Sequence, residues 1–512
     1  MELEEIRDII RFVKTYYSKD LAPLDLKNLA SDESRVASFF QILNDTKVEK
    51  DEEAAATLYG SSRLDSKYMF LKSNFTSRVL NSVASLDLVR REISDYTRAV
   101  NKAYKQLFIS STLLRLGSRR GAISLAKRTL RLAQKYELHH VAVELLEKLR
   151  TNALQAGKTG NYDKYLRKLE TEMDLLNSES RVKTLEERVL IHSARSIYID
   201  ETLQEQANSS LLEMAAILKG HESFMIRMAH FRMQYMYYQL TGNPQRSIQA
   251  CDEAIAYMAE MPHMVLPTSF GEFELYKLEN CILTHDYNNG KETAIRCSAY
   301  FTSGTNNWFL YKGFEYILLM HTLRFEEARD VFEEVTTNSR YASQPSHLRE
   351  RWDIFRFYLD YVLDLNGESS GDQTLRKSKL LLHRKYRKKV TEFPTFSGDK
   401  RGLNVSILVM NILLLLESNR KDRLFEQVEA LTTYRTSHLK GKNSHQSAIL
   451  LRLIQMMVRC DFDLKRMRKN ASALERKLGS TMPSPTEIFE CVQVLPPDWI
   501  WARMKAALIH YS

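Results

Sequence analysis

Residues Leu240–Pro262 read LTGNPQRSIQACDEAIAYMAEMP, and this stretch contains the pattern that decides the fold. The turn sequence Gly242-Asn-Pro is followed by small residues at steps of four and three: Ser247, Cys251 and Ala254. This spacing places the three residues on one face of a helix, where their small size lets a neighbouring helix approach closely. An aromatic-rich run, 231–238, lies just before the turn. The stretch therefore predicts two helices joined by a tight turn.

The same combination of turn and helix recurs along the chain. Its turns fall at residues 117, 160, about 202, 242, about 289, 323 and 419. The successive gaps are 43, 42, 40, 47, 34 and 96 residues, and the last gap is wide enough for two units. A period of about 40 residues with two helices in each unit is typical of an α-solenoid, a stack of helix pairs. We therefore predict an all-α fold.

Two stretches resemble the tetratricopeptide-repeat superfamily, whose frame reads L-G-x-Y…A…F…A. The frame is visible in outline in Leu240–Pro262 and again in Leu323–Val335, LRFEEARDVFEEV. The resemblance extends over about residues 95–478, but Pro244 and Arg119 stand where the family has an aromatic residue, and most units are longer than the usual repeat of about 34 residues. It implies a right-handed α-solenoid of antiparallel helix pairs.

The two ends of the chain do not follow this frame. We expect residues 1–92 to form an N-terminal helical domain, residues 93–478 the repeat array and residues 479–512 a C-terminal cap. The cap should contain an amphipathic helix that begins at the prolines 496–497. Its apolar side chains would cover the last repeat, which otherwise exposes its stacking face. These side chains are Trp499, Ile500, Met504 and Leu508.

The composition favours long helices. Glycine (17) and proline (10) total 27 of 512 residues, about 5% against an average usage of roughly 12%. A chain so poor in turn residues disfavours folds built from many short strands, such as β-sandwiches and barrels. It also disfavours a Gly-rich nucleotide-binding fold.

We expect a cytoplasmic protein. The five cysteines are an odd number without a Cys-x-x-Cys pair, which argues against a disulfide framework and a structural zinc site. The N-terminal sequence MELEEIRDIIRFVK lacks the apolar core of a signal peptide. The most apolar stretch, Leu403–Leu416, has 14 residues, whereas a bilayer span needs about 20. We therefore expect a buried helix there.

The sequence contains none of the common catalytic or phosphate-binding motifs. H-E-x-x-H, G-x-S-x-G, G-x-x-x-x-G-K-[ST] and G-x-G-x-x-G are all absent. His139 and His140 are adjacent and point to different faces of their predicted helix, so they cannot chelate a metal as an i, i+4 pair would. We therefore expect no enzymatic activity, no cofactor and no metal site.

The densest basic cluster lies at residues 376–401. Nine basic residues, one histidine among them, fall within the 14 residues 376–389, where no residue is acidic. The cluster predicts an amphipathic helix whose cations bind an anionic partner: an acidic protein face, a nucleic acid or an anionic membrane surface. The alternative is a solvated helix face, or cations that pair with acidic neighbours. The candidate binding residues are Arg376, Lys377, Lys379, Arg384, Lys385, Arg387, Lys388, Lys389, Lys400 and Arg401.

Two aromatic stretches, 230–238 and 308–316, are dense in large rings. Packing between helices explains them most simply. The alternative is a concave groove where rigid aromatic rings bind a peptide. Nearby arginines could then hold the carboxylate of that peptide through paired hydrogen bonds. The candidate residues are Arg227, Arg232, Tyr235, Tyr238 and Trp308.

Residues 51–78 contain two predicted helices around Gly60, a layout that permits a DNA-binding helix-turn-helix. The chain would then resemble bacterial regulators that join a DNA-binding head to a tetratricopeptide-like body that senses a peptide. Our leading hypothesis is a non-enzymatic scaffold, adaptor or regulator that binds a protein or peptide, with an acidic surface, through a helical-repeat surface. The alternative is a transcriptional regulator that binds nucleic acid.

Overall fold

The computed structural model describes most of the chain, and all its regular elements there are helices. The described residues are 1–16, 35–44, 48–61, 64–85, 93–195, 201–368, 403–418, 421–438, 446–481 and 493–509. Contacts divide the chain into two compact units, Met1–Leu169 and Glu170–Ser512. The three-part division into 1–92, 93–478 and 479–512 stays a prediction.

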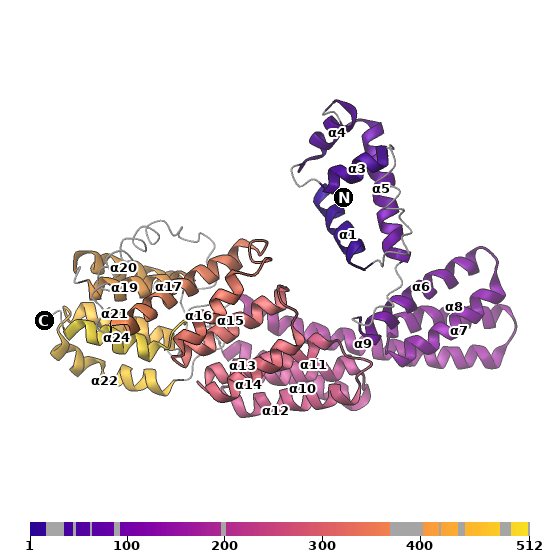
Figure 1. Cartoon of the computed structure of the whole chain (residues 1–512). Coiled ribbons are helices and arrows are strands. Elements are labelled where there is room, and N and C mark those ends of the chain that lie inside the picture. Colours follow the sequence, from indigo (N-terminus) through magenta and orange to yellow (C-terminus); the bar gives the residue numbers. More distant parts are fainter. Residues whose placement is uncertain are drawn as a thin grey trace. The chain divides into compact units, whose positions relative to one another are not determined.

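The first unit contains seven complete helices within its described residues and the beginning of α9 (Thr159–Arg195). They are α1 (Leu3–Tyr16), α3 (Arg35–Asn44), α4 (Asp51–Tyr59), α5 (Ser66–Ser85), α6 (Asp95–Arg115), α7 (Arg119–Lys135) and α8 (His139–Gln155). Helices α1, α3, α4 and α5 share one apolar core, in which the ring of Phe39 meets those of Tyr68 and Phe75 edge to face. Helices α6, α7 and α8 pack in sequence beside one another (Figure 1).

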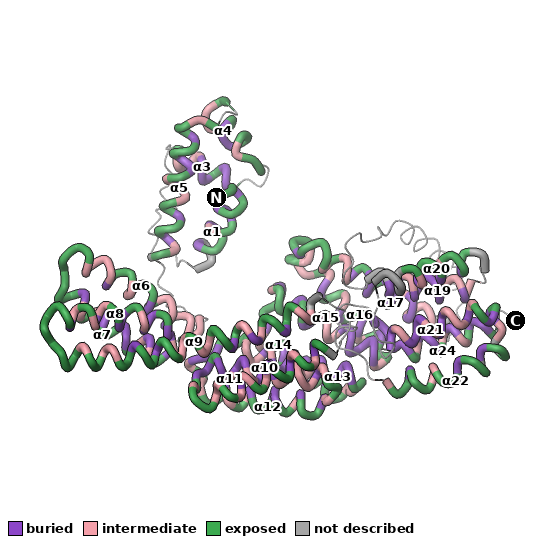
Figure 2. The backbone as a smooth tube through the Cα atoms, turned by 180° about the vertical axis from the view of Figure 1, so that it is seen from behind, coloured by how far each residue is buried: buried purple, intermediate pink, exposed green. Residues whose placement is uncertain are grey.

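The second unit contains the rest of α9 and a longer series of helices. They are α10 (Glu201–Gly220), α11 (Phe224–Leu240), α12 (Pro244–Glu260), α13 (Pro267–Leu283), α14 (Tyr287–Tyr300), α15 (Asn306–His321), α16 (Phe325–Thr336), α17 (Ser346–Glu368), α19 (Leu403–Glu417), α20 (Lys421–His438), α21 (Gln446–Arg459), α22 (Leu464–Ser480) and α24 (Pro497–Ile509). Consecutive helices pack against each other (Figure 1), and their buried residues face these neighbours while exposed residues lie on the outer sides (Figure 2). The predicted all-α fold of packed helix pairs is confirmed.

One turn geometry joins many of these helices. A residue with left-handed φ ends the first helix, and the N–H group of the next residue donates to the carbonyl five residues earlier. These bonds are Ser118→Leu113, Leu138→Ala133, Lys158→Ala153, Asn243→Tyr238, Asp286→Cys281 and Arg324→Leu319, each 2.8–3.0 Å long. The next helix begins immediately afterwards, so only three residues separate the two helices. The predicted turns at 117, 242 and 323 have this geometry.

Helix α9 differs from the predicted pattern. The frame expects two helices between residues 160 and 202, but the structure has one helix of 37 residues, Thr159–Arg195. Residues 161–195 contain no glycine and no proline, so nothing there supplies a left-handed residue or a missing N–H group that would end the helix. The second half of α9 packs through Val182, Leu185 and Val189 against α10 and α11.

The C-terminal helix covers its neighbours as expected. Ile500, Met504 and Leu508 of α24 are buried, and α24 packs against α19, α21 and α22. The apolar stretch 403–416 forms α19, whose described side chains are mostly buried in the same core. Among the described helices, none combines the length and the hydropathy that crossing a membrane requires.

The turn between α15 and α16 gives a test of this geometry. Leu323 has a φ of 60°, which costs a residue with a Cβ roughly 1–2 kcal/mol. Leu323→Gly should raise the free energy of unfolding by about 0.5–1 kcal/mol, because glycine removes this strain although it frees the unfolded chain. Leu212→Gly, in the interior of α10 and also exposed, is the control and should lower it by about 1 kcal/mol. Urea denaturation measures both, and equal losses would contradict a strained turn.

Candidate partner-binding surfaces

The basic cluster lies outside the described residues. All ten of its candidate residues, from Arg376 to Arg401, fall within the range 369–402. Their role in binding an anionic partner stays a prediction from the sequence.

The two candidate arginines, Arg227 and Arg232, lie on α11 and already have acidic partners. The Nε atom of Arg232 lies 2.5 Å from Oε1 of Glu186, and its Nη2 atom lies 3.3 Å from Oε2 of the same carboxylate. This is the paired geometry that we expected with a peptide carboxylate, but the carboxylate here belongs to α9. Arg227 pairs with Glu222 at the end of the loop before α11.

Tyr235 lies in the interior between α11 and α13. Its ring stacks on that of Tyr276, with centroids 3.9 Å apart and planes 12° from parallel, and its hydroxyl donates to the Glu279 carboxyl. Burial raises the pKa of Glu279 to about 8 although the hydrogen bond from Tyr235 opposes this shift. At neutral pH the carboxyl is therefore mostly protonated, and a buried negative charge is avoided.

Trp308 and Tyr238 also lie in contacts between side chains. Trp308 is buried, with its ring edge to face with that of Phe309, and Nζ of Lys312 lies 5.9 Å from its centroid. Tyr238 is partly exposed, and the guanidinium of Arg246 lies 5.7 Å from its ring. A peptide could reach Tyr235 or Trp308 only if the helices around them separated. The binding role of these residues stays a prediction.

A groove near Trp308 is open to solvent. It lies between α15, the connection 337–345 and α17, and has a volume of about 130 Å³. The lining residues are Asn306, Phe309, Leu310, Gly313, Tyr341, Gln344, Leu348, Arg351 and Trp352. We call it the α15–α17 groove. The aromatic stretch 308–316 contributes Phe309, Leu310 and Gly313 to the lining, whereas the candidate residue Trp308 is not among the lining residues.

The polar groups of the α15–α17 groove are few. Gln344 is more than nine-tenths buried, and its Oε1 atom accepts no hydrogen bond from the described residues. Arg351 is partly exposed and has no ion pair with any carboxylate of the described chain. The first turn of α17 contains no acidic residue, so its positive helix end is also uncompensated. The groove therefore favours an anion beside an apolar group.

A second surface is the exposed face of α7. Five cations, Arg120, Lys127, Arg128, Arg131 and Lys135, are exposed there, and α7 contains no acidic residue. At about 100° per residue they fall within an arc of about 100°, over a length of about 22 Å. None of the five has an acidic partner among the described residues, and Lys135 lies over the ring of Tyr136. We call this row the α7 cationic face.

The α7 cationic face does not stand out as a basic cluster in the sequence. In the sequence these cations alternate with the small residues of the helix frame, so no local window is as basic as 376–389. A helical projection of 119–135 would have separated a buried face of small residues from a cationic face.

The segment 51–78 places one of its cations in the interior. Lys72 on α5 is buried, and its ammonium lies 2.7 Å from the carboxylate of Asp51 at the start of α4. The hydroxyl of Tyr68 donates to the same carboxylate. The exposed side of α5 carries Met69 and Phe70 beside Lys67. Lys72 is therefore not available to a DNA phosphate.

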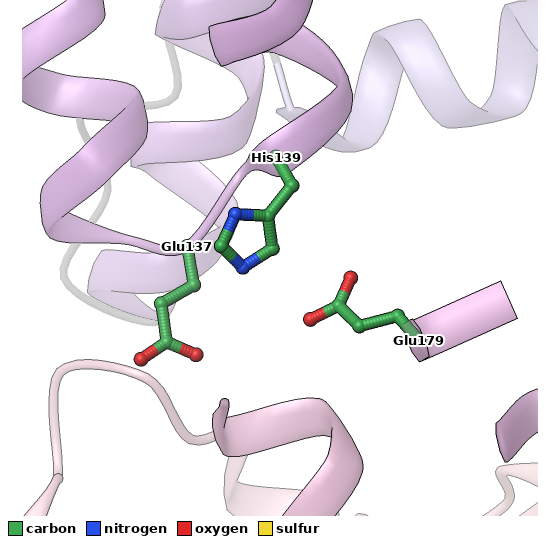
Figure 3. Close-up of side chains that lie close together, drawn as sticks. All are labelled: Glu137, His139 and Glu179. Atoms are coloured by element: carbon green, nitrogen blue, oxygen red, sulfur yellow. The ribbon is translucent and has the colours of Figure 1, made fainter. Parts of the chain in front are cut away.

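One histidine and two acidic side chains near the start of α8 have residue types that could bind a metal ion. Figure 3 shows Glu137 in the turn before α8 and His139 at its first residue, together with Glu179 of α9. Glu137 is the left-handed residue of its turn, with a φ of 50°, and Glu179 accepts a hydrogen bond from the Ser223 hydroxyl. The first two residues belong to Met1–Leu169 and Glu179 to Glu170–Ser512, so we assign no metal site to them.

Comparisons with known proteins leave the family open. No protein-family model matches the chain, and no curated protein matches its sequence.

Buried Glu279 predicts how stability depends on pH. The native carboxyl keeps its proton up to about pH 8, whereas in the unfolded chain it loses the proton near its ordinary pKa of 4.5. Between these values the unfolded state binds fewer protons, so the free energy of unfolding falls as pH rises. Glu279→Gln is neutral at every pH and should remove this part of the fall.

The measurement is the melting temperature of each variant from about pH 5 to about pH 8. The difference between wild type and Glu279→Gln should change steadily over this range. The exposed Glu260→Gln variant is the control and should follow wild type. Parallel curves for wild type and Glu279→Gln would contradict a native carboxyl that is protonated at neutral pH.

Proposed function

We propose that this protein is a non-enzymatic scaffold, adaptor or regulator that binds a protein or peptide partner through a surface of packed helices. The observation that carries the proposal is the α15–α17 groove: an apolar hollow, open to solvent, beside Arg351, which forms no ion pair with the described residues. Ligand sites are commonly apolar hollows with a few convergent polar groups. Neighbouring helix pairs would hold such a groove in a fixed shape.

The proposal includes the finer architecture that the sequence suggests. A right-handed solenoid with a period of about 40 residues, related to tetratricopeptide repeats, would present several helix faces to one partner. The packing of consecutive helices within each unit supports this architecture. An acidic partner is supported by the formal charge of +10 and by the α7 cationic face.

A pull-down from the native host tests the proposal, with the full chain as bait. We expect a specific protein partner, and we expect its recovery to fall when Lys385, Arg387, Lys388 and Lys389 are changed to glutamate, because like charges then repel an acidic surface. The control carries four reversals at dispersed exposed residues: Lys164, Lys219, Arg459 and Lys469. Failure of the wild-type bait to retain any protein above an empty matrix would count against the proposal.

The second candidate function is nucleic-acid binding, and the α7 cationic face is the observation that favours it. Its arginines and lysines, which form no ion pairs with carboxylates of the described residues, form a row along one helix, an arrangement that can follow a phosphate backbone. This candidate differs from the first in its dependence on salt. Each phosphate contact releases counterions, so the affinity for duplex DNA falls by about 0.9 log units per log unit of salt for each contact.

The test uses mixed-sequence duplex DNA and a range of salt concentrations. Reversing Lys127, Arg128 and Arg131 to glutamate should weaken binding and reduce the salt slope by about 2.7, the value for three lost contacts. Three reversals elsewhere, at Lys219, Arg349 and Lys469, are the control and should leave the slope close to that of wild type. No binding at low salt, or equal slopes for the two variants, would exclude α7 as a nucleic-acid surface.

A further inference from the structure

Helices α13, α14 and α15 each contain one glycine, at 271, 290 and 313, and the surroundings of these glycines differ. A Cβ atom at Gly271 would lie 2.6 Å from the ring of Phe301, and one at Gly290 would lie 2.5 Å from a methyl group of Leu318. Close packing between helices explains both glycines. A Cβ atom at Gly313 would meet no atom of the described residues within 4 Å, and its φ is not left-handed. Neither packing nor backbone geometry therefore requires glycine at 313.

Glycine at this position is unfavourable for the helix itself. In the interior of a helix, glycine is among the least favourable residues, because folding removes more backbone freedom from glycine than from other residues. Gly313 lies in the middle of α15 and lines the α15–α17 groove. The missing side chain leaves the wall of the groove open at that point. The groove thus gains space at the expense of helix propensity.

The size and chemistry of this space indicate what enters it. A cavity of about 150 Å³ holds a benzene ring, so about 130 Å³ accommodates a side chain of the size of leucine or phenylalanine. Phe309, Trp352 and Leu348 offer apolar contacts. Oε1 of Gln344 can accept a hydrogen bond from a backbone N–H group, and Arg351 can bind a carboxylate.

We propose that the α15–α17 groove binds an extended segment of a partner protein, placing a large apolar side chain over Gly313 and an adjacent acidic side chain beside Arg351. This inference rests on the proposed function and names the chemistry of the partner. The uncompensated positive end of α17 favours the same acidic residue. Exposed Leu310, at the edge of the groove, extends the apolar contact along the segment.

The test begins with a phage-displayed library of random linear peptides, selected on the full chain. The enriched peptides should share a large apolar residue next to aspartate or glutamate. A synthetic peptide with the enriched sequence is then titrated against wild type, Gly313→Leu and Arg351→Glu. Each variant should bind at least about tenfold more weakly, because leucine fills the hollow and glutamate repels the acidic residue.

Two matched controls accompany these variants. Gly479→Leu places the same side chain at another helical glycine of this unit, with no atom of the described residues in its Cβ direction, and Arg476→Glu makes the same charge change at an exposed position of α22. Both should bind as wild type does. Gly313→Leu should melt at a higher temperature than wild type, because leucine favours the helix. If it melts lower, Arg351→Glu alone decides.

The outcomes separate this inference from the proposed function. If enriched peptides bind Gly313→Leu and Arg351→Glu as tightly as wild type, the groove is not their site, and peptide binding itself stands. If no peptide is enriched, this inference fails, and the pull-down alone decides the proposed function. If sedimentation shows a wild-type dimer that Gly313→Leu dissociates, the groove holds a second copy of this chain, and the partner segment is excluded.

Discussion

The fold depends on one backbone constraint, the turn in which a left-handed residue ends a helix and the following N–H group donates to the carbonyl five residues earlier. This hydrogen bond satisfies a carbonyl that the helix end would leave exposed. It also fixes the exit direction of the chain, so the next helix begins at once beside the previous one. Glycine supplies the left-handed residue at 117, 157 and 242, whereas Glu137, His285 and Leu323 adopt it with strain.

Between the turns, buried polar contacts determine how neighbouring helices align. The hydroxyl of Tyr316 donates to the carbonyl of Phe355, and that of Tyr358 donates to the carbonyl of Ser406. Tyr235 and Glu279 connect α11 with α13 in the same way. Each such group would be costly to bury without its partner, so the contacts allow only one register between the helices. The surfaces that remain open, such as the α15–α17 groove, keep their shape as a result.

The candidate surfaces lie where this packing leaves side chains unused. Arg232 and Lys72 form ion pairs within the fold, with Glu186 and Asp51 respectively. Arg351 and the cations of the α7 cationic face have no such partner in the described chain. An unpaired cation on a rigid helix is available to an anionic ligand with little loss of side-chain packing. This contrast separates candidate binding residues from structural ones better than charge in the sequence does.

The sequence by itself determined the helical class and the turns at 117, 242 and 323. Its small residues at steps of three and four, and the glycines at 117 and 242, act locally, within one turn of helix. The sequence also placed the C-terminal helix with Ile500, Met504 and Leu508 on its buried side. The repeat frame wrongly predicted a turn within α9. The absence of glycine and proline from 161–195 is the local signal for one continuous helix.

Only the tertiary structure decided which side chains are used and which are free. Arg232 and Tyr235 have partners 46 and 44 residues away in the chain, and no local pattern shows such a pairing. The meaning of Gly313 likewise depends on α17 and the connection 337–345, which leave the space beside it open. The physical reason is the range of the forces: helix formation depends on neighbours within four residues, whereas burial and pairing depend on helices that meet only after folding.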